Sequence, residues 1–176
     1  MLGGFPFKIL GFHADNGSEY INHRVATLLE KLLIEFIKSR PRHSNDNALA
    51  ESKNGAVIRK HLGYAHIPQH CASLANAFCM GYLNPYVNFH RPCFFPETIT
   101  GKNGKERKRY RYEDMMTPYE KLKSLPEAKR YLKPGVTFKQ LDAQAKSMSD
   151  NDAATALNNA RRKLFQAIST AIRERA

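Results

Sequence analysis

The sequence contains no apolar run long enough to span a membrane, because no stretch approaches 18 consecutive apolar residues. Its first eleven residues carry one lysine and no small-residue cleavage site, so a secretory signal is not indicated. Cysteine is scarce: Cys71, Cys79 and Cys93 are an odd number without framework spacing, which favours reduced thiols in a cytoplasmic protein. His66 and His70 lie near the first two, but the spacing matches no zinc finger or ribbon, so packed or half-exposed side chains are the preferred interpretation.

Acidic residues are also scarce. The chain has 16 Asp and Glu against 28 Lys and Arg, which gives a net charge of +12 and a pI near 9.8. A polyanion is therefore a better candidate partner than a neutral small molecule. The excess is uneven, since residues 1–100 carry a net charge of +3 and residues 101–176 carry +9. A length of 176 residues suits one compact domain and an appendage.

Hydrophobic patterning predicts alternating strands and helices in the first half. An apolar run at residues 7–13 predicts a buried strand that ends in a turn, and residues 34–39 predict a second strand. Between them, Asn22 can cap a helix with one apolar stripe, formed by Val25, Leu28, Leu29, Leu32 and Leu33. Further helices are predicted over residues 48–62 and from about residue 72 to 89, the latter closed by Pro85 or by the Arg91-Pro92 pair.

The second half begins with a basic segment. Residues 97–114 contain a run of lysines and arginines with two interleaved tyrosines, and three prolines then punctuate a linker-like region. A last helix is predicted from Asp150, with one apolar stripe formed by Leu157, Leu164, Phe165, Ile168 and Ile172. This stripe either covers part of the core or pairs with another subunit, and covering the core is the preferred interpretation.

Two carboxylates are the strongest chemical signal. On the helix over residues 48–62, Glu51 interrupts an apolar stripe, and an ionised carboxylate facing a core needs a positive or hydrogen-bonding partner unless it rims the stripe in solvent. Asp15 directly follows the first predicted strand, and 35 residues separate it from Glu51. Such carboxylates can hold hydrated Mg²⁺ ions while leaving room for phosphate.

At these residues the sequence resembles the DDE transposases and retroviral-type integrases. Residues 13–20 (HADNGSEY) resemble the family's second-aspartate block, and residues 39–41 (SRP) with 45–55 (NDNALAESKNG) resemble its glutamate block. Residues 59–64 (RKHLGY) continue that block, and residues 83–89 (LNPYVNF) resemble the end of the core in bacterial insertion-sequence transposases. The resemblance covers most of residues 5–125, and the ordered set of motifs is what makes it specific.

The resemblance implies an α/β fold of the RNase H-like type, the integrase catalytic core, with a basic C-terminal extension. It divides the chain into a partial core at residues 1–95, a basic linker or small DNA-contacting segment at 96–135 and a helical tail at 136–176. It also implies that Asp15 and Glu51 are catalytic metal ligands for Mg²⁺ or Mn²⁺. In such a site, water or a DNA 3′-hydroxyl attacks a phosphodiester in line, without a covalent protein intermediate.

The expected partner is DNA, both transposon ends and target. Near the expected metal site, the candidate DNA contacts are Asn16, Lys53 and Arg59. For each of them a role without DNA stays open: Asn16 can simply form a turn, and Lys53 and Arg59 can lie on a solvated helix face. Lys60 is a weaker candidate. In the basic segment, four side chains suit neutralisation of phosphates beside two tyrosines that can stack, namely Arg107, Lys108, Arg109 and Arg111. The alternative there is a basic surface loop of no special affinity.

One family feature is missing. The family site has three carboxylates, and residues 1–14 contain neither Asp nor Glu. We therefore expect a carboxy-terminal part of a transposase, inactive on its own, that self-associates or pairs with a full-length transposase in the bacterial cytoplasm, associated with the nucleoid. Two alternatives stay open: a non-enzymatic DNA-binding protein, and an accessory or inhibitory subunit of an intact transposase.

Overall fold

The computed structural model describes residues 5–14, 23–39, 54–101 and 103–174. The chain divides into two compact units, each described by itself below. The small unit comprises the described residues between 8 and 66, and the helical unit comprises residues 5–7 with those from 67 to 174. These units are defined by packing. The division into segments 1–95, 96–135 and 136–176 was made from composition and resemblance, and it stays a prediction.

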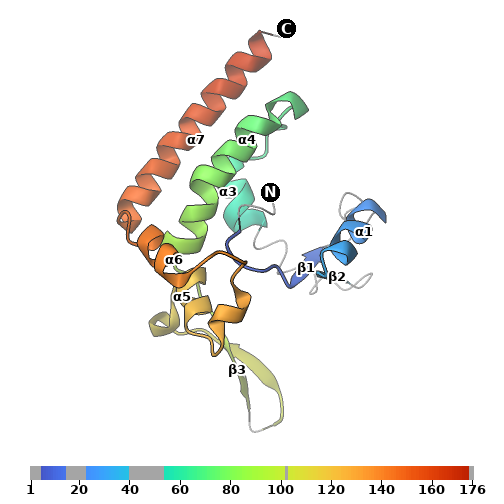
Figure 1. Cartoon of the computed structure of the whole chain (residues 1–176), viewed down its shortest axis with the longest axis vertical. Coiled ribbons are helices and arrows are strands. Elements are labelled where there is room, and N and C mark those ends of the chain that lie inside the picture. Colours follow the sequence, from blue (N-terminus) through green and yellow to red (C-terminus); the bar gives the residue numbers. More distant parts are fainter. Residues whose placement is uncertain (1–4, 15–22, 40–53, 102, 175–176) are drawn as a thin grey trace. The chain divides into compact units, whose positions relative to one another are not determined.

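The small unit contains the predicted strand, helix and strand. They are β1 (Gly11–Ala14), α1 (His23–Lys31) and β2 (Glu35–Lys38). The two strands pair in parallel, with Gly11 opposite Glu35 and Ala14 opposite Lys38. A helical crossover is the usual connection between parallel strands, so this pairing agrees with the predicted order of strand, helix and strand. Figure 1 shows this β1–α1–β2 unit in blue.

Helix α1 ends in a Schellman-type turn. The Ile34 amide donates to the Leu29 carbonyl at 2.9 Å, and the Leu33 amide donates to the Glu30 carbonyl at 3.0 Å. Leu33 has φ of 54°, the left-handed conformation that this turn requires and that glycine normally supplies. Its side chain is 91 % exposed, so it contributes little packing in return.

We expect Leu33→Gly to stabilise the small unit by about 0.5–1 kcal/mol, because glycine removes the steric cost of the left-handed conformation. Hydrogen exchange of the α1 amides, followed by mass spectrometry, should slow by about two- to five-fold. Leu32→Gly is the control, since Leu32 has no positive φ and glycine there should accelerate exchange. Faster exchange in Leu33→Gly would contradict the expectation.

The helix predicted over residues 48–62 is described from residue 54. It consists of a π-helical segment, η2 (Asn54–Arg59), and a final turn, α3 (Lys60–Leu62). The sequence pattern places Gly55, Ile58 and Leu62 with Glu51 on the apolar face of this helix. That prediction is wrong in this part, because Ile58 is 46 % exposed whereas His61 is buried. Residues in a π-helix turn through a smaller angle per step than in an α-helix, so a face projected at 100° per residue is not kept.

The helical unit begins with a helical run that contains the one predicted over residues 72–89. Its segments are η3 (Gln69–Cys71), α4 (Ala72–Phe78), η4 (Cys79–Leu83) and η5 (Tyr86–His90). The run passes through Pro85, whose backbone is α-helical, and ends where Arg91 becomes extended. Of the two predicted stops, the Arg91-Pro92 pair is therefore correct. The side chain of Asn88 donates to the Asn84 carbonyl at 2.8 Å beside the proline.

The remaining elements follow in chain order. A hairpin of β3 (Glu97–Thr100) and β4 (Glu106–Arg109) leads to a 3₁₀ turn, η6 (Tyr112–Asp114). Short helices α5 (Pro118–Lys123), η7 (Ala128–Tyr131) and α6 (Phe138–Ala145) come next. Thr117 and Thr137 begin α5 and α6 with capping boxes to Glu120 and Gln140. The segment predicted as linker-like thus contains regular structure.

A compact core joins these short helices to η5. Its buried residues are Phe89, Tyr119, Leu132 and Leu141. The Phe89 and Tyr119 rings lie 5.2 Å apart between centroids. Phe7 packs against this cluster and forms an isolated antiparallel bridge with Leu132. The start of the chain therefore contributes to a core built mostly from the second half.

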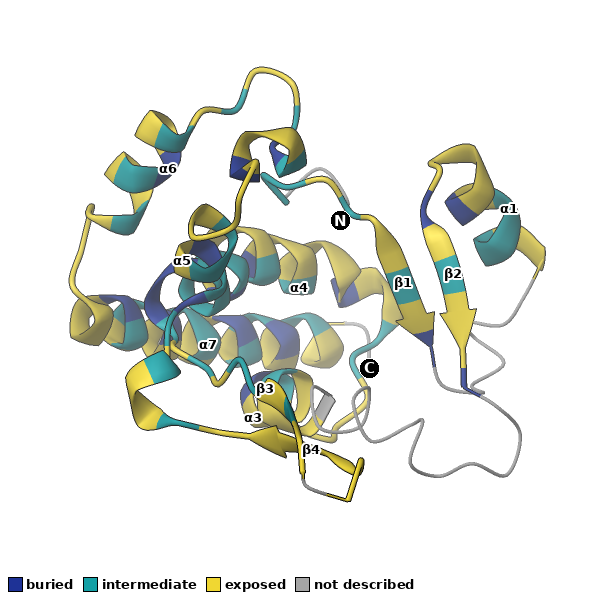
Figure 2. Cartoon of the chain, turned by 90° about the horizontal axis from the view of Figure 1, so that it is seen from below, coloured by how far each residue is buried: buried dark blue, intermediate teal, exposed yellow. Residues whose placement is uncertain are grey.

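Helix α7 (Asp150–Arg173) closes the unit by packing against α4, η4 and η5. Figure 1 shows α4 and α7 side by side, and Figure 2 shows a buried stripe along α7 with an exposed opposite face. Leu157, Leu164 and Ile168 are buried as predicted, whereas Ile172 is 43 % exposed. Covering the core, the preferred interpretation of this stripe, is therefore correct for most of its length.

A polar network borders the core between α5 and α6. Tyr119 donates to Asp142 at 2.7 Å, and the Lys123 ammonium lies 2.6 Å from the same carboxylate oxygen. The hydrogen bond from Lys123, which has the larger effect, and the hydrogen bond from Tyr119 together hold the pKa of Asp142 below its ordinary value. Burial, followed by the Asp142 hydrogen bond, raises the pKa of Tyr119 well above its ordinary value.

We expect this network to make stability depend on acid pH. Because the pKa of Asp142 is lower in the folded state, its contribution is present above the unfolded value of about 3.9 and is lost as pH falls through the folded value. Asp142→Asn should therefore melt below the wild type at pH 7, and the difference should shrink below about pH 4. Glu106→Gln, which neutralises an exposed carboxylate outside this network, is the control for thermal melts followed by circular dichroism.

Candidate nucleic-acid interface

The hairpin of β3 and β4 carries the predicted basic cluster. Its loop is closed by two hydrogen bonds, from the Gly101 amide to the Lys105 carbonyl and from the Gly104 amide to the Gly101 carbonyl, both 2.9 Å. Gly104 has φ of 69°, which the turn needs and glycine allows. In Figure 1 the hairpin projects away from the helices of its unit. Projection of this kind exposes both faces of the strands.

The register divides the basic residues between the two faces. Glu97 lies opposite Arg109, and Ile99 lies opposite Arg107, so Arg107 and Arg109 share one face. Lys108 lies opposite Thr98 and points to the other face. Within the described part of the chain, Arg107 and Lys108 make no ion pair. Phosphates from a partner can therefore reach these two cations without displacing a carboxylate of that part of the chain.

The other two predicted contacts are engaged within the unit. Arg109 pairs with Glu97 at 2.8 Å. Arg111 donates to Glu97 at 3.1 Å and to Asp114 at 2.6 Å, and it lies 3.3 Å from Glu113. These pairs are partly exposed, so each is weak and can exchange a carboxylate for a phosphate. Arg111 therefore connects the base of the hairpin to η6 in this structure.

Exposed aromatic side chains lie beside the arginines. Tyr110 is 59 % exposed and Tyr112 is 85 % exposed. Both make edge-to-face contacts with Phe94, at centroid distances of 5.9 Å and 5.4 Å. Exposed rings within a basic segment are the features from which single-stranded and flexible nucleic-acid contacts are built. The two interleaved tyrosines of the sequence are thus on the surface.

The predicted site near the metals falls largely outside the described residues. Asp15, Asn16, Glu51 and Lys53 lie there, so their predicted roles stay predictions. Arg59 is described: it ends η2, and its guanidinium lies over the Tyr64 ring at 5.3 Å from the centroid. A cation held on an exposed ring keeps its donors available to a further partner.

The structure describes the end of strand β1, which Asp15 directly follows in the sequence. Asp15 is the next residue after Ala14, the last of β1, at the carboxyl end of the parallel pair. At the same end, the Ser39 amide donates to the Ala14 carbonyl at 3.1 Å, and the Ser39 hydroxyl lies 3.4 Å from Nε2 of His13. Ser39 is buried, so this end of the strands is fixed by hydrogen bonds.

Sequence reasoning missed the acidic partners of the hairpin. Glu97 and Asp114 were counted only toward net charge, although residues 97–114 hold four acids against six bases. The two glycines at 101 and 104 were the available signal, because a turn there places Glu97 opposite Arg109. Phe94, the ring that both tyrosines contact, had no such signal.

Comparisons with known proteins give a weak likeness. No family model matches the sequence, and no solved structure matches it. Among curated proteins, the chain is similar to "Uncharacterized protein y4rM" of Sinorhizobium fredii, with 32 % identity over 106 residues. The alignment covers 60 % of this chain and 30 % of that protein, so the chain spans less than a third of the relative's length.

Two kinds of feature are absent from the described residues. None of their helices combines the length and apolar character that crossing a membrane requires. Nor do any three of their His, Cys, Asp and Glu side chains gather as a metal site. The two predicted metal ligands are not among these residues.

Proposed function

We propose that this chain is a carboxy-terminal part of a DDE transposase with an RNase H-like core, which binds DNA and contributes two carboxylates to metal-dependent strand transfer. The observation that carries the proposal is the parallel β1–α1–β2 unit, in which Asp15 directly follows the first strand. Carboxyl ends of parallel strands are where α/β folds place their sites. The ordered motifs around Asp15 and Glu51 add the reaction class.

The donor set fits Mg²⁺ or Mn²⁺, because both proposed ligands are carboxylates and hard cations prefer oxygen. When bound, such ions activate the attacking oxygen and stabilise the leaving one. Asp15 and Glu51 would hold them, and Arg59 would contact phosphate near them.

Pairing with a full-length transposase, or with another copy, is part of the proposal. Several large apolar side chains of the small unit are exposed, namely Leu10, Leu28, Leu32, Leu33 and Ile37. Exposed apolar surface of this kind favours contact with further polypeptide. The proposed location is the bacterial cytoplasm, at the nucleoid.

The test starts with the nucleotide sequence upstream of the Met1 codon, over about one domain length, translated in three frames. An encoded strand bearing an Asp would supply the third carboxylate. The joined polypeptide should then transfer a DNA 3′ end in Mg²⁺. Asp15→Asn and Glu51→Gln should each abolish transfer, because a lost ligand leaves the metals misplaced.

Glu19→Gln, a neutralised carboxylate in the same sequence block, is the matched control and should keep activity. Transfer that survives Asp15→Asn would contradict the metal assignment. If no upstream frame encodes such a strand, the catalytic proposal is overturned.

A non-enzymatic DNA-binding protein is the second candidate. It is favoured by the division of the chain, because the basic hairpin belongs to the helical unit, whereas Asp15 and Glu51 fall in the sequence range of the small unit. For this candidate function, we expect that the affinity for DNA falls steeply with salt and that Asp15→Asn and Glu51→Gln leave it unchanged.

A further inference from the structure

The solvent face of α7 has an unusual composition for an exposed helix. The 21 residues between Asp152 and Glu174 contain no acidic side chain and four basic ones. Solvated helices usually mix both signs in pairs three or four residues apart. Here the exposed positions are amides, hydroxyls and cations: Thr155, Asn158, Asn159, Arg162, Lys163, Gln166, Ser169, Thr170 and Arg173, with Ile172 the apolar exception.

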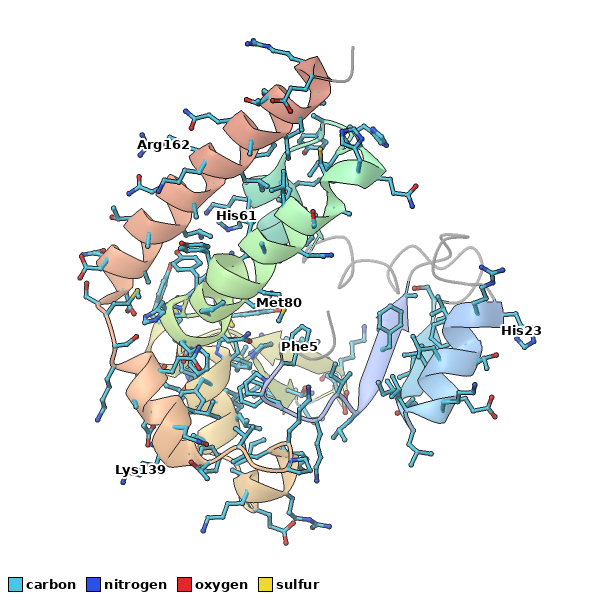
Figure 3. All side chains as sticks on the ribbon, turned by 45° about the horizontal axis from the view of Figure 1, so that its top comes forward. Phe5, His23, His61, Met80, Lys139 and Arg162 are labelled. Carbon is cyan, nitrogen blue, oxygen red and sulfur yellow. The ribbon has the colours of Figure 1, made fainter. Side chains whose placement is uncertain are left out.

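The part of the chain that the structure describes leaves the cations on this face without carboxylate partners. Within the described residues, Arg162, Lys163 and Arg173 make no ion pair. Arg162 donates through Nη2 to the Asn159 side chain at 2.7 Å, which orients the guanidinium and leaves its other donors available. Figure 3 shows Arg162 pointing away from α4. The hairpin differs, because its arginines 109 and 111 are held by carboxylates.

The geometry of the face suits an elongated polyanion. Arg162 and Arg173 are eleven residues apart, so they lie within about 20° of each other around the helix and about 16 Å apart along it. The opposite stripe is packed against α4, η4 and η5, which fixes the helix in its unit. A preorganised row of cations and amides therefore extends over about 22 Å from residue 158 to residue 173, the length of about six base pairs.

We propose that this face of α7 is a second DNA-contacting surface, one that binds the phosphates and groove edges of duplex DNA. The inference rests on the proposed DNA-binding function and adds to it a site separate from the hairpin. Duplex is favoured over single strands because no aromatic residue is among the exposed positions. It is favoured over a protein partner because the face has a single exposed large apolar side chain and no acid. Arg, Asn and Gln are also the side chains that read base edges in the major groove, which admits an α-helix.

The test is the affinity of the complete 176-residue chain for a fluorescently labelled 30-base-pair duplex, measured by anisotropy from about 50 to 200 mM salt. We expect Arg162→Gln/Arg173→Gln to weaken binding about ten-fold or more at low salt. The variant should also lower the slope of log affinity against log salt by about 1.8, the value for two lost phosphate contacts. Glutamine keeps the helix propensity, so the melting temperature should not change.

Lys129→Gln/Lys139→Gln is the matched control, since it removes the same charge from exposed positions of the same unit. If the α7 variant binds like this control, the inference is overturned while DNA binding itself stands. If the wild type does not bind duplex DNA, the inference and the DNA-binding proposal both fail. Binding to poly-glutamate that depends on Arg162 and Arg173, with no such dependence for the duplex, would instead indicate an acidic protein partner and overturn the inference. Strand transfer by the joined polypeptide is a separate readout, so its failure would not be confused with these results.

Discussion

Leu157→Ala should strongly destabilise the helical unit. The side chain is 2 % exposed in the middle of the α7 stripe, where truncation leaves a cavity between α7 and the helices beneath it. Such substitutions cost about 2–5 kcal/mol. With a urea dependence of about 1.5 kcal/mol per molar, a loss of about 3 kcal/mol lowers the unfolding midpoint by about 2 M.

Ile172→Ala is the matched control on the same helix. The sequence pattern placed both residues on one stripe, but Ile172 is 43 % exposed, so its truncation should cost less than about 0.5 kcal/mol. Urea unfolding followed by circular dichroism measures both variants. Equal losses would mean that the end of α7 is packed as firmly as its middle.

The second large effect concerns the hairpin. We expect Arg107→Gln/Lys108→Gln to reduce the salt dependence of DNA binding, because these two cations pair with no carboxylate among the described residues. Losing two phosphate contacts flattens the slope by about 1.8, which corresponds to about a 12-fold difference over a four-fold change in salt. Anisotropy titrations at 50 and 200 mM salt give the two values needed.

Arg109→Gln/Arg111→Gln removes the same charge from the engaged pair. This variant should change the slope less, since these guanidiniums must first leave Glu97 and Asp114. An equal change in both variants would show that phosphates displace the carboxylates freely. An unchanged slope in Arg107→Gln/Lys108→Gln would exclude the hairpin as a DNA surface.

The sequence predicted those elements whose pattern is local and strongly periodic. The strand, helix and strand before residue 39 and the long helix from Asp150 are present as predicted. The long helix buries most of its predicted stripe, whereas the predicted stripe of α1 is wrong, because Leu28, Leu32 and Leu33 are exposed and Leu29 is buried. The face of the helix near Ile58 was wrong because the chain there is π-helical. The hairpin was missed since its register depends on two turn glycines rather than on alternating apolar residues.

The candidate site was predictable only in its residue types. Patterns of charge located the basic segment, but they did not show that Glu97 engages two of its arginines. That contact depends on strand pairing, which brings together residues far apart in the sequence. The proposed metal ligands were found from motifs alone, and the structure adds the strand end that precedes Asp15.

The bridge between Phe7 and Leu132 bears on how this protein is dissected. Phe7 packs into a core whose other members come from the second half, and the Lys133 amide donates to the Pro6 carbonyl at 3.1 Å. A recombinant fragment that starts at residue 67 would lack residues 5–7 and would expose Leu132 and its neighbours in the core to solvent. A fragment of the helical unit for DNA-binding experiments should therefore be made by an internal deletion that keeps residues 5–7, and not by an amino-terminal truncation.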